Sequence, residues 1–99
     1  MNTMQIDNPL LTSEAVLEIK NKVQNNTATA KDYETLDTFL SAISLGGYIL
    51  KQMRLNGFPT YQSFINDSSK KDNFSRSYIY GAITEAISQL QNFLVENNL

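Results

Sequence analysis

The chain has 99 residues, 41% of them hydrophobic, a formal net charge of −2, and neither cysteine nor histidine. This length suits one domain with a modest core. The missing residue types exclude disulfides, thiolate and imidazole metal ligands, and the usual general base near neutral pH. We therefore expect a non-catalytic protein without cofactor or metal, and the lack of cysteine favours a cytoplasmic location.

The first 25 residues predict a loose arm followed by a short helix. Pro9 disfavours helix before it, so residues 1–11 are expected to form an N-terminal arm. Thr12 is a typical N-cap, and apolar residues then recur at helical spacing over 13–25. No linker divides the remainder, so 12–99 is expected to be a single helical domain. Neither a secretory signal peptide nor an apolar run of about 18 residues is seen, which predicts no membrane segment.

The most strongly predicted element is a long helix over residues 30–55. Thr29 and Asp32 have the spacing of a capping box at its start. Asn56 and Gly57 are typical of a helix C-terminus. Apolar residues continue between these ends without a proline, and they occupy much of the helix circumference. Such a helix is expected to be enclosed by several neighbours or by a second subunit.

Two further helices complete the predicted fold. Thr60 is the expected cap of a short helix over 60–66, and the polar stretch after it predicts an exposed, mobile loop. A long terminal helix over 74–96 has an apolar side and a mainly polar side. The fold class is therefore all-α: a small four-helix bundle-like domain with two long helices and two short ones.

The glycines inside the predicted long helices require an explanation. An interior glycine destabilises a helix by about 0.5–1 kcal/mol relative to alanine. We expect Gly46 and Gly47 to form a crossing point, either with the last helix near Gly81 or with their own copy in a dimer. The alternatives are a kink at the glycine pair and a ligand pocket lined by bare backbone.

The acidic residues show no catalytic pattern. Glu14, Glu18 and Lys22 are spaced four residues apart, as in a solvated ladder of ion pairs on a helix surface. Glu85 is either a lone buried acid or part of a surface row that ends at Glu96. The glycines match neither phosphate-binding spacing.

These features favour a protein-interaction module that acts through protein–protein contacts, with itself as one expected partner in a homodimer. An adaptor, an immunity protein and a phage-type inhibitor of a host enzyme all fit this description. The interface candidates are small or aromatic residues near the centre of the long helix and its C-terminal corner. They are Gly46, Gly47, Tyr48, Phe58, Tyr61 and Phe64.

Uneven charge leaves two alternatives open. Residues 1–50 carry three basic and six acidic side chains, whereas residues 51–78 carry five basic and two acidic ones. The basic segment around 70–80 suggests a nucleic-acid-binding module, although the turn before it is longer than that of a helix-turn-helix. A small anionic ligand such as a nucleotide is the other alternative. The residues expected to contact either are Lys51, Arg54, Lys70, Lys71, Arg76, Tyr78 and Tyr80.

Overall fold

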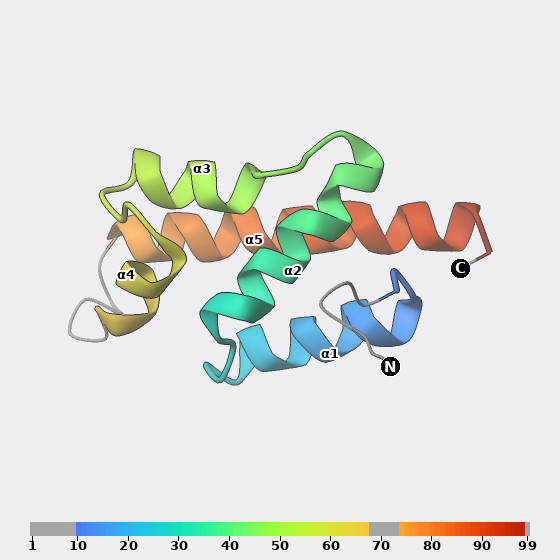
Figure 1. Cartoon of the computed structure of the whole chain (residues 1–99), viewed down its shortest axis with the longest axis horizontal. Helices are drawn as coiled ribbons and strands as arrows, with labels where there is room; N and C mark the ends of the chain where they lie inside the picture. The colour runs from blue at the N-terminus through green and yellow to red at the C-terminus, as the bar shows by residue number, and fades with distance from the viewer. Residues whose placement is uncertain (1–9, 68–73, 99) are drawn as a thin grey trace, which may run out of the picture.

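A computed structural model describes residues 10–67 and 74–98 of the chain. All regular structure in this described part is helical, which confirms the all-α fold class. The helices form a body of 39 × 34 × 23 Å (Figure 1). Most of the predicted N-terminal arm and most of the predicted loop after residue 66 lie outside the described residues.

Threonine caps start three of the helices where the sequence predicts them. Helix α1 (Ser13–Gln24) is capped by Thr12, whose side chain accepts a hydrogen bond from the backbone N–H of Ala15 at 3.1 Å. Helix α2 (Ala30–Leu40) begins at the predicted capping box of Thr29 and Asp32. Helix α4 (Tyr61–Asn66) begins after Thr60, which forms a second capping box with Ser63. Each cap satisfies N–H groups that the first helical turn leaves unpaired.

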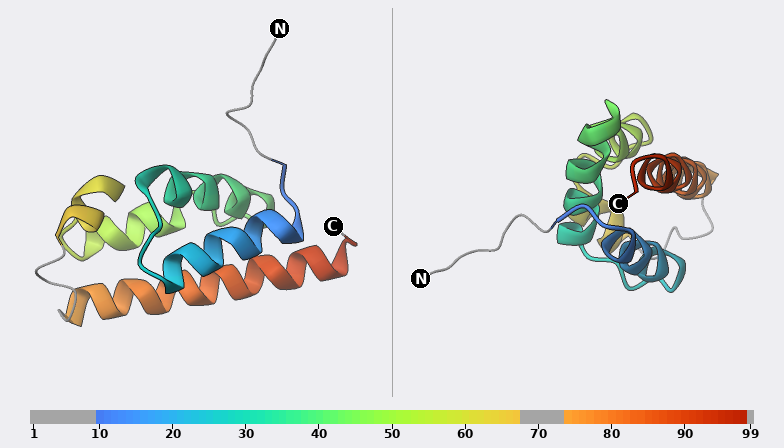
Figure 2. Two further views of the ribbon diagram at one scale, coloured as in Figure 1. Left: turned by 90° about the horizontal axis from the view of Figure 1, so that it is seen from below. Right: turned by 90° about the vertical axis from the view of Figure 1, so that its right-hand side faces the viewer.

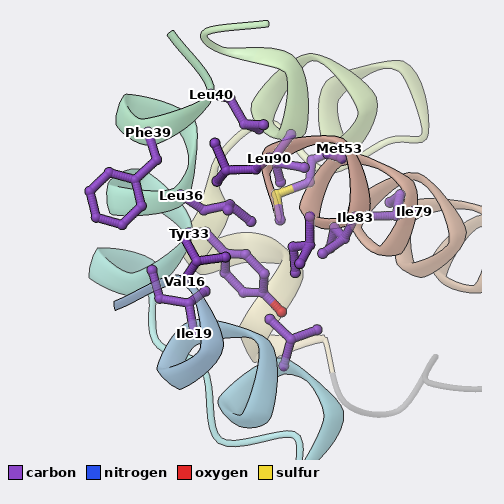
Figure 3. Packing of buried hydrophobic residues seen from close by; sticks show 14 of the residues in the cluster. Val16, Ile19, Tyr33, Leu36, Phe39, Leu40, Met53, Ile79, Ile83 and Leu90 are labelled. Carbon is purple, nitrogen blue, oxygen red and sulfur yellow. The ribbon is translucent and has the colours of Figure 1, made fainter. Parts of the chain in front are cut away.

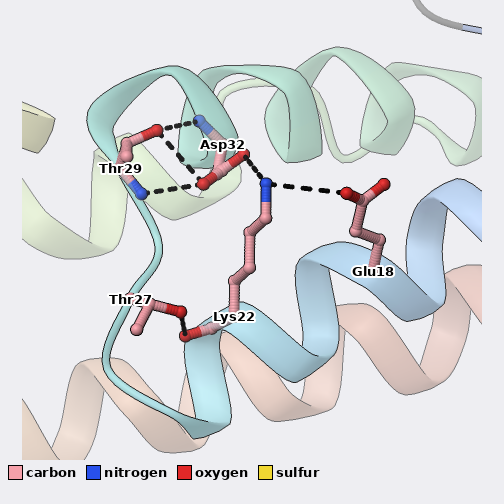
Figure 4. Close-up of polar contacts among 5 residues, drawn as sticks. All are labelled: Glu18, Lys22, Thr27, Thr29 and Asp32. Carbon is pink, nitrogen blue, oxygen red and sulfur yellow. Dashed lines mark hydrogen bonds and ion pairs between the residues drawn. The ribbon is translucent and has the colours of Figure 1, made fainter.

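The α1–α2 corner is held by Lys22, whose ammonium group lies between two carboxylates (Figure 4). It lies 3.8 Å from Glu18 on its own helix and 3.4 Å from Asp32 on α2. The Glu18–Lys22 part of the predicted surface ladder is therefore present. Since Glu18 is exposed and Lys22 is partly exposed, these pairs contribute about 0–1 kcal/mol each.

The predicted helix over 30–55 is not continuous, and this part of the prediction is wrong. Helix α2 ends at Leu40, a single 3₁₀ turn η1 follows (Ser41–Ile43), and helix α3 (Tyr48–Leu55) begins only after Gly47. Ser44 and Gly47 both have left-handed backbone, with φ of 66° and 75°. These two residues reverse the chain direction, so that α3 runs back alongside α5 (Figure 1).

A buried carboxylate compensates for the broken helix. Asp37 on α2 is only 5% exposed and accepts hydrogen bonds from the backbone N–H groups of Ile49, at 2.9 Å, and Leu50, at 3.1 Å. These groups lie in the first turn of α3, where no intrahelical acceptor exists. Gly47 has no side chain to cap α3, so Asp37 supplies the cap from another helix.

The longest helix, α5 (Phe74–Glu96), has the predicted bounds and packs against α1, α2 and α3. Its inner side buries Ile79, Ile83 and Leu90 against residues such as Leu36 and Met53 (Figure 3). The described chain thus has five α-helices instead of four, because the long central helix is replaced by α2 and α3.

Candidate functional site

The side of α5 that faces away from the core is the most unusual surface of the described chain. Viewed end-on, α1 to α4 all lie to one side of α5 (Figure 2). The exposed residues on its other side recur at alternating intervals of four and three, which places them in one row along the helix. We call this row the outer face of α5. It consists of Phe74, Tyr78, Gly81, Glu85, Ser88, Asn92 and Val95.

Three large hydrophobic side chains lie on the outer face of α5. Phe74 is 84% exposed, Tyr78 is 58% exposed and Val95 is 77% exposed. Phe74 and Tyr78 are one turn apart at the start of the helix, and Val95 lies near its end. Phe74 and Tyr78 are neighbours on one face, and adjacent exposed apolar side chains mark interaction surfaces more often than an isolated one such as Val95 does.

Gly81 lies on this face at a position where nothing in residues 10–67 and 74–98 requires a glycine. A Cβ atom added there would have no described neighbour within 4 Å. The predicted crossing between Gly81 and the Gly46–Gly47 pair inside one molecule is therefore wrong. The destabilising effect of an interior helix glycine, about 0.5–1 kcal/mol, has no intramolecular compensation at this position.

Gly46 and Gly47 have local roles in the α2–α3 connection. A Cβ atom on Gly46 would lie 2.4 Å from the Oγ of Ser41, and Gly47 has the left-handed backbone that begins α3. The helix predicted over residues 30–55 is thus broken at the glycine pair. Of the predicted explanations for this pair, a kink is the closest to what the structure contains. Tyr48, the third interface candidate of this segment, is partly buried against the core.

The other three interface candidates belong to an aromatic cluster that joins α4 to α2 through Tyr33. Phe58 and Phe64 are buried, with ring centroids 5.2 Å apart in an edge-to-face arrangement. Tyr61 stacks on Tyr33 at 6.4 Å between centroids, and its hydroxyl donates a hydrogen bond to Asp37. Burial, together with this hydrogen bond and the negative charge of Asp37, raises the pKa of Tyr61 above its usual value. Phe58 and Phe64 are therefore core residues in this structure.

The predicted anion-binding residues that the structure describes are divided between α3 and α5 and do not all lie on one surface. Lys51 and Arg54 are exposed on α3, and the Nε of Arg54 donates to the carbonyl oxygen of Pro59 at 3.1 Å. Tyr78 belongs to the outer face of α5. Lys70 and Lys71 lie outside the described residues.

Arg76, the central residue of the predicted basic segment, is only 5% exposed. Its guanidinium carbon lies 3.9 Å from the ring centroid of Phe64, and its terminal nitrogens donate to the carbonyl oxygen of Phe64 and to the hydroxyl of Tyr80. Arg76 and Tyr80 therefore join α5 to α4, and the guanidinium of Arg76 is bound inside the molecule, whereas Tyr80 is only partly buried.

Asp37 is a residue that sequence reasoning missed. It follows Tyr33 by four residues and Leu36 by one, and thus lies on the apolar side of α2. An acidic residue in that position is the signal that would have indicated a buried capping role. Its three donors are all structural groups of the fold.

Within residues 10–67 and 74–98, no group of three or more acidic side chains has the geometry to hold a metal ion. No helix in the same ranges combines the length and apolarity that a membrane crossing requires. Comparison of the chain with protein-family models, with curated proteins and with solved structures finds no match. The arguments for function therefore come from this chain's own surface.

Proposed function

We propose that this small all-α domain is a non-catalytic protein-binding module and that the outer face of α5 is its binding surface. The observation that carries the proposal is the exposure of Phe74, Tyr78 and Val95 on one uncovered helix face. Exposing these side chains to water is unfavourable by roughly 25 cal/mol per Å² of apolar surface, and a partner that covers them recovers this energy. Aromatic residues are also enriched among the few residues that dominate binding energy at interfaces.

The rest of the surface supports this choice of face. Of the other large exposed hydrophobic residues in the described ranges, Leu10 precedes α1, Leu17 lies on α1 and Leu55 lies at the end of α3. Isolated exposed side chains of this kind are normal in soluble proteins. An adaptor, an immunity protein or an inhibitor of another protein would each work through such a helix face, and a cytoplasmic location belongs to the same proposal.

The proposal is tested by removing the aromatic end of the face. A Phe74→Ser/Tyr78→Ser double variant is compared with the parent chain and with Leu17→Ser, which removes an exposed leucine from α1. Each tagged protein is used for affinity capture from the cells that express it naturally. Circular dichroism and melting temperature first establish that the variants fold.

We expect one set of proteins to be retained by the parent and by Leu17→Ser and to be lost with the double variant. The proteins that are retained are expected to include further copies of the chain itself. If the folded double variant retains the same proteins as the parent, the outer face of α5 is not the binding surface and the proposal is wrong.

A further inference from the structure

Asn56 and Gly57, at the C-terminal end of α3, are the only asparagine–glycine pair in the sequence. An asparagine side chain has the length at which the backbone nitrogen of the next residue can attack its carbonyl carbon and close a five-membered ring. Glycine in the next position favours this reaction, because it has no side chain to shield its nitrogen and its backbone rotates most freely. In the unfolded chain, Asn56 is therefore the asparagine most reactive toward its own backbone.

In the folded chain the nitrogen of Gly57 belongs to a Schellman motif, which we call the C-terminal cap of α3. The N–H of Gly57 donates to the carbonyl oxygen of Arg54 at 3.2 Å, and the N–H of Phe58 donates to that of Met53 at 2.8 Å. Gly57 has the left-handed backbone of this motif, with φ of 95°. Phe58 is only 6% exposed, so the cap is closed by a core side chain.

The side chain of Asn56 is held away from the nitrogen that would attack it. Its Nδ2 donates to the carbonyl oxygen of Gln52 at 2.8 Å. With ψ of 18°, the main chain of Asn56 turns the Gly57 nitrogen away from the side chain. Ring closure requires the hydrogen bonds of Nδ2 and of the Gly57 N–H to break and the Cα–C bond of Asn56 to rotate. The cap must therefore open before the reaction occurs.

We propose that Asn56 is a self-modification site, which loses its side-chain amide when the C-terminal cap of α3 opens. The Gly57 nitrogen gives up its proton and forms a bond to Cγ of Asn56. The bond from Cγ to Nδ2 breaks, and Nδ2 leaves as ammonia with that proton. Water then opens the resulting succinimide ring at either carbonyl carbon and leaves aspartate or isoaspartate. Water is the only co-reactant, and nothing is oxidised or reduced.

Either product weakens the corner between α3 and α4 (Figure 1). Both replace the donor to the Gln52 carbonyl oxygen by a carboxylate, and a negative charge at a helix C-terminus is unfavourable. Isoaspartate also adds one carbon atom to the main chain before Gly57, which changes the spacing that the Phe58 hydrogen bond requires. Phe58 packs on Phe64 at 5.2 Å between ring centroids, so the change reaches the aromatic cluster. The modification is thus a one-way change.

Mass spectrometry of the intact chain and of its peptides, after incubation in mildly alkaline buffer with and without urea, tests the site and its control by folding. A reaction confined to the open form follows the population of that form, so Asn56 should convert at least about tenfold more slowly in the folded chain. Asn25, which is followed by Asn26, is the internal comparison and should stay an amide for longer in urea. Equal conversion of Asn25 and Asn56 in urea would show that the site is wrong. Equal rates for Asn56 with and without urea would show that the cap does not control it.

Arg54→Ala tests the role of the cap without unfolding the chain. The Nε of Arg54 donates to the carbonyl oxygen of Pro59 across the cap, at 3.1 Å. Loss of this hydrogen bond should speed the conversion of Asn56 about threefold in native buffer and leave it unchanged in urea. Lys51→Ala removes a charge from the exposed side of the same helix and should match the parent. Equal native rates for Arg54→Ala and Lys51→Ala would overturn control by the cap.

Asn56→Asp reproduces one product and tests the consequence. Its melting temperature should fall by about 4 °C, whereas Asn92→Asp, which adds the same charge on the exposed side of α5, should change it less. Asn56→Gln keeps an amide but is too long for the five-membered ring, so it should resist conversion in urea. Loss of ammonia at position 56 in Asn56→Gln at the parent's rate would contradict the proposed reaction. Equal melting temperatures for Asn56→Asp and Asn92→Asp would contradict the weakened corner.

Discussion

Asp37 and Tyr61 are joined by a hydrogen bond of 2.5 Å, from the tyrosine hydroxyl on α4 to a carboxylate oxygen on α2. The same carboxylate accepts the N–H groups of Ile49 and Leu50 at the start of α3. One buried side chain therefore fixes the positions of three helices. It lies where the predicted continuous helix is broken, and it satisfies the donors that the break exposes.

Replacement of Asp37 by alanine is expected to lower the free energy of unfolding by about 3 kcal/mol. The substitution leaves two N–H groups of α3 and the hydroxyl of Tyr61 without their acceptor, and a buried unpaired donor is unfavourable by about 1–3 kcal/mol. Urea unfolding of the purified variant measures the loss. Tyr61→Phe removes only one of the three donors and keeps the ring stacked on Tyr33, so its loss should be about 1.5 kcal/mol.

Glu34→Ala is the matched control on α2. Glu34 is exposed, and its ion pair in the described part of the chain is with Lys31 across 3.6 Å on the surface, so its removal should change stability by less than about 0.5 kcal/mol. A loss in Asp37→Ala no larger than in Glu34→Ala would show that the capping role assigned to Asp37 is wrong.

The stability of the chain is expected to fall at alkaline pH. Burial raises the pKa of both Tyr33 and Tyr61 above the ordinary value of 10.0. Above that pH the unfolded chain releases protons that the folded chain retains, so the folded state becomes less stable as pH rises. The stabilising contribution is fully present below about pH 10 and is lost as pH rises toward the folded-state pKa values.

Unfolding free energies measured by urea between about pH 8 and pH 11 test this expectation. Tyr61→Phe and Tyr33→Phe each remove one of the two groups, so each should show a shallower fall than the parent. Parallel curves for the parent and both variants would contradict the assignment of the alkaline loss to these tyrosines.

Two glycine-to-alanine substitutions should have opposite effects on stability. Gly47 has φ of 75°, which is unfavourable for a residue with a side chain, so Gly47→Ala is expected to destabilise the fold by about 1 kcal/mol. Gly81 has ordinary helical backbone and free space around its Cβ position, so Gly81→Ala should stabilise it by about 0.5–1 kcal/mol. Thermal unfolding at low concentration measures both. Changes of equal sign would contradict these local explanations.

Helix starts were predictable because their signals are local. Thr12, Thr29 and Thr60 each bond to an N–H within the next few residues, and such a contact depends only on the neighbouring sequence. Ser44 carries no such signal. Its left-handed backbone depends on how α3 packs against α2 and α5, and a helical apolar pattern continues through the break.

The outer face of α5 was predicted only in part. The sequence indicates Tyr78 as a contact for anions, and it gives Phe74 no role beyond the start of the terminal helix. The sequence alone does not decide whether Phe74 and Val95 are buried or exposed, because the helix row that contains these apolar residues also contains polar ones. Only the positions of the neighbouring helices decide which side of α5 is uncovered.

Arg76 is expected to be a stability determinant instead of a surface cation. Its guanidinium lies over Phe64 and donates to Phe64 and Tyr80, while its Nε is buried with no hydrogen-bond partner in the described ranges. Arg76→Ala removes the cation–π contact and leaves a cavity, so it should lower the unfolding free energy by about 3 kcal/mol. Arg76→Met fills the same volume without a buried charge, so it should lower the unfolding free energy by less than Arg76→Ala does. Urea unfolding measures these losses. Arg54→Ala, on the exposed side of α3, is the control and should lower the unfolding free energy by under about 1 kcal/mol. Equal losses for Arg54→Ala and Arg76→Ala would show that the buried role of Arg76 is wrong.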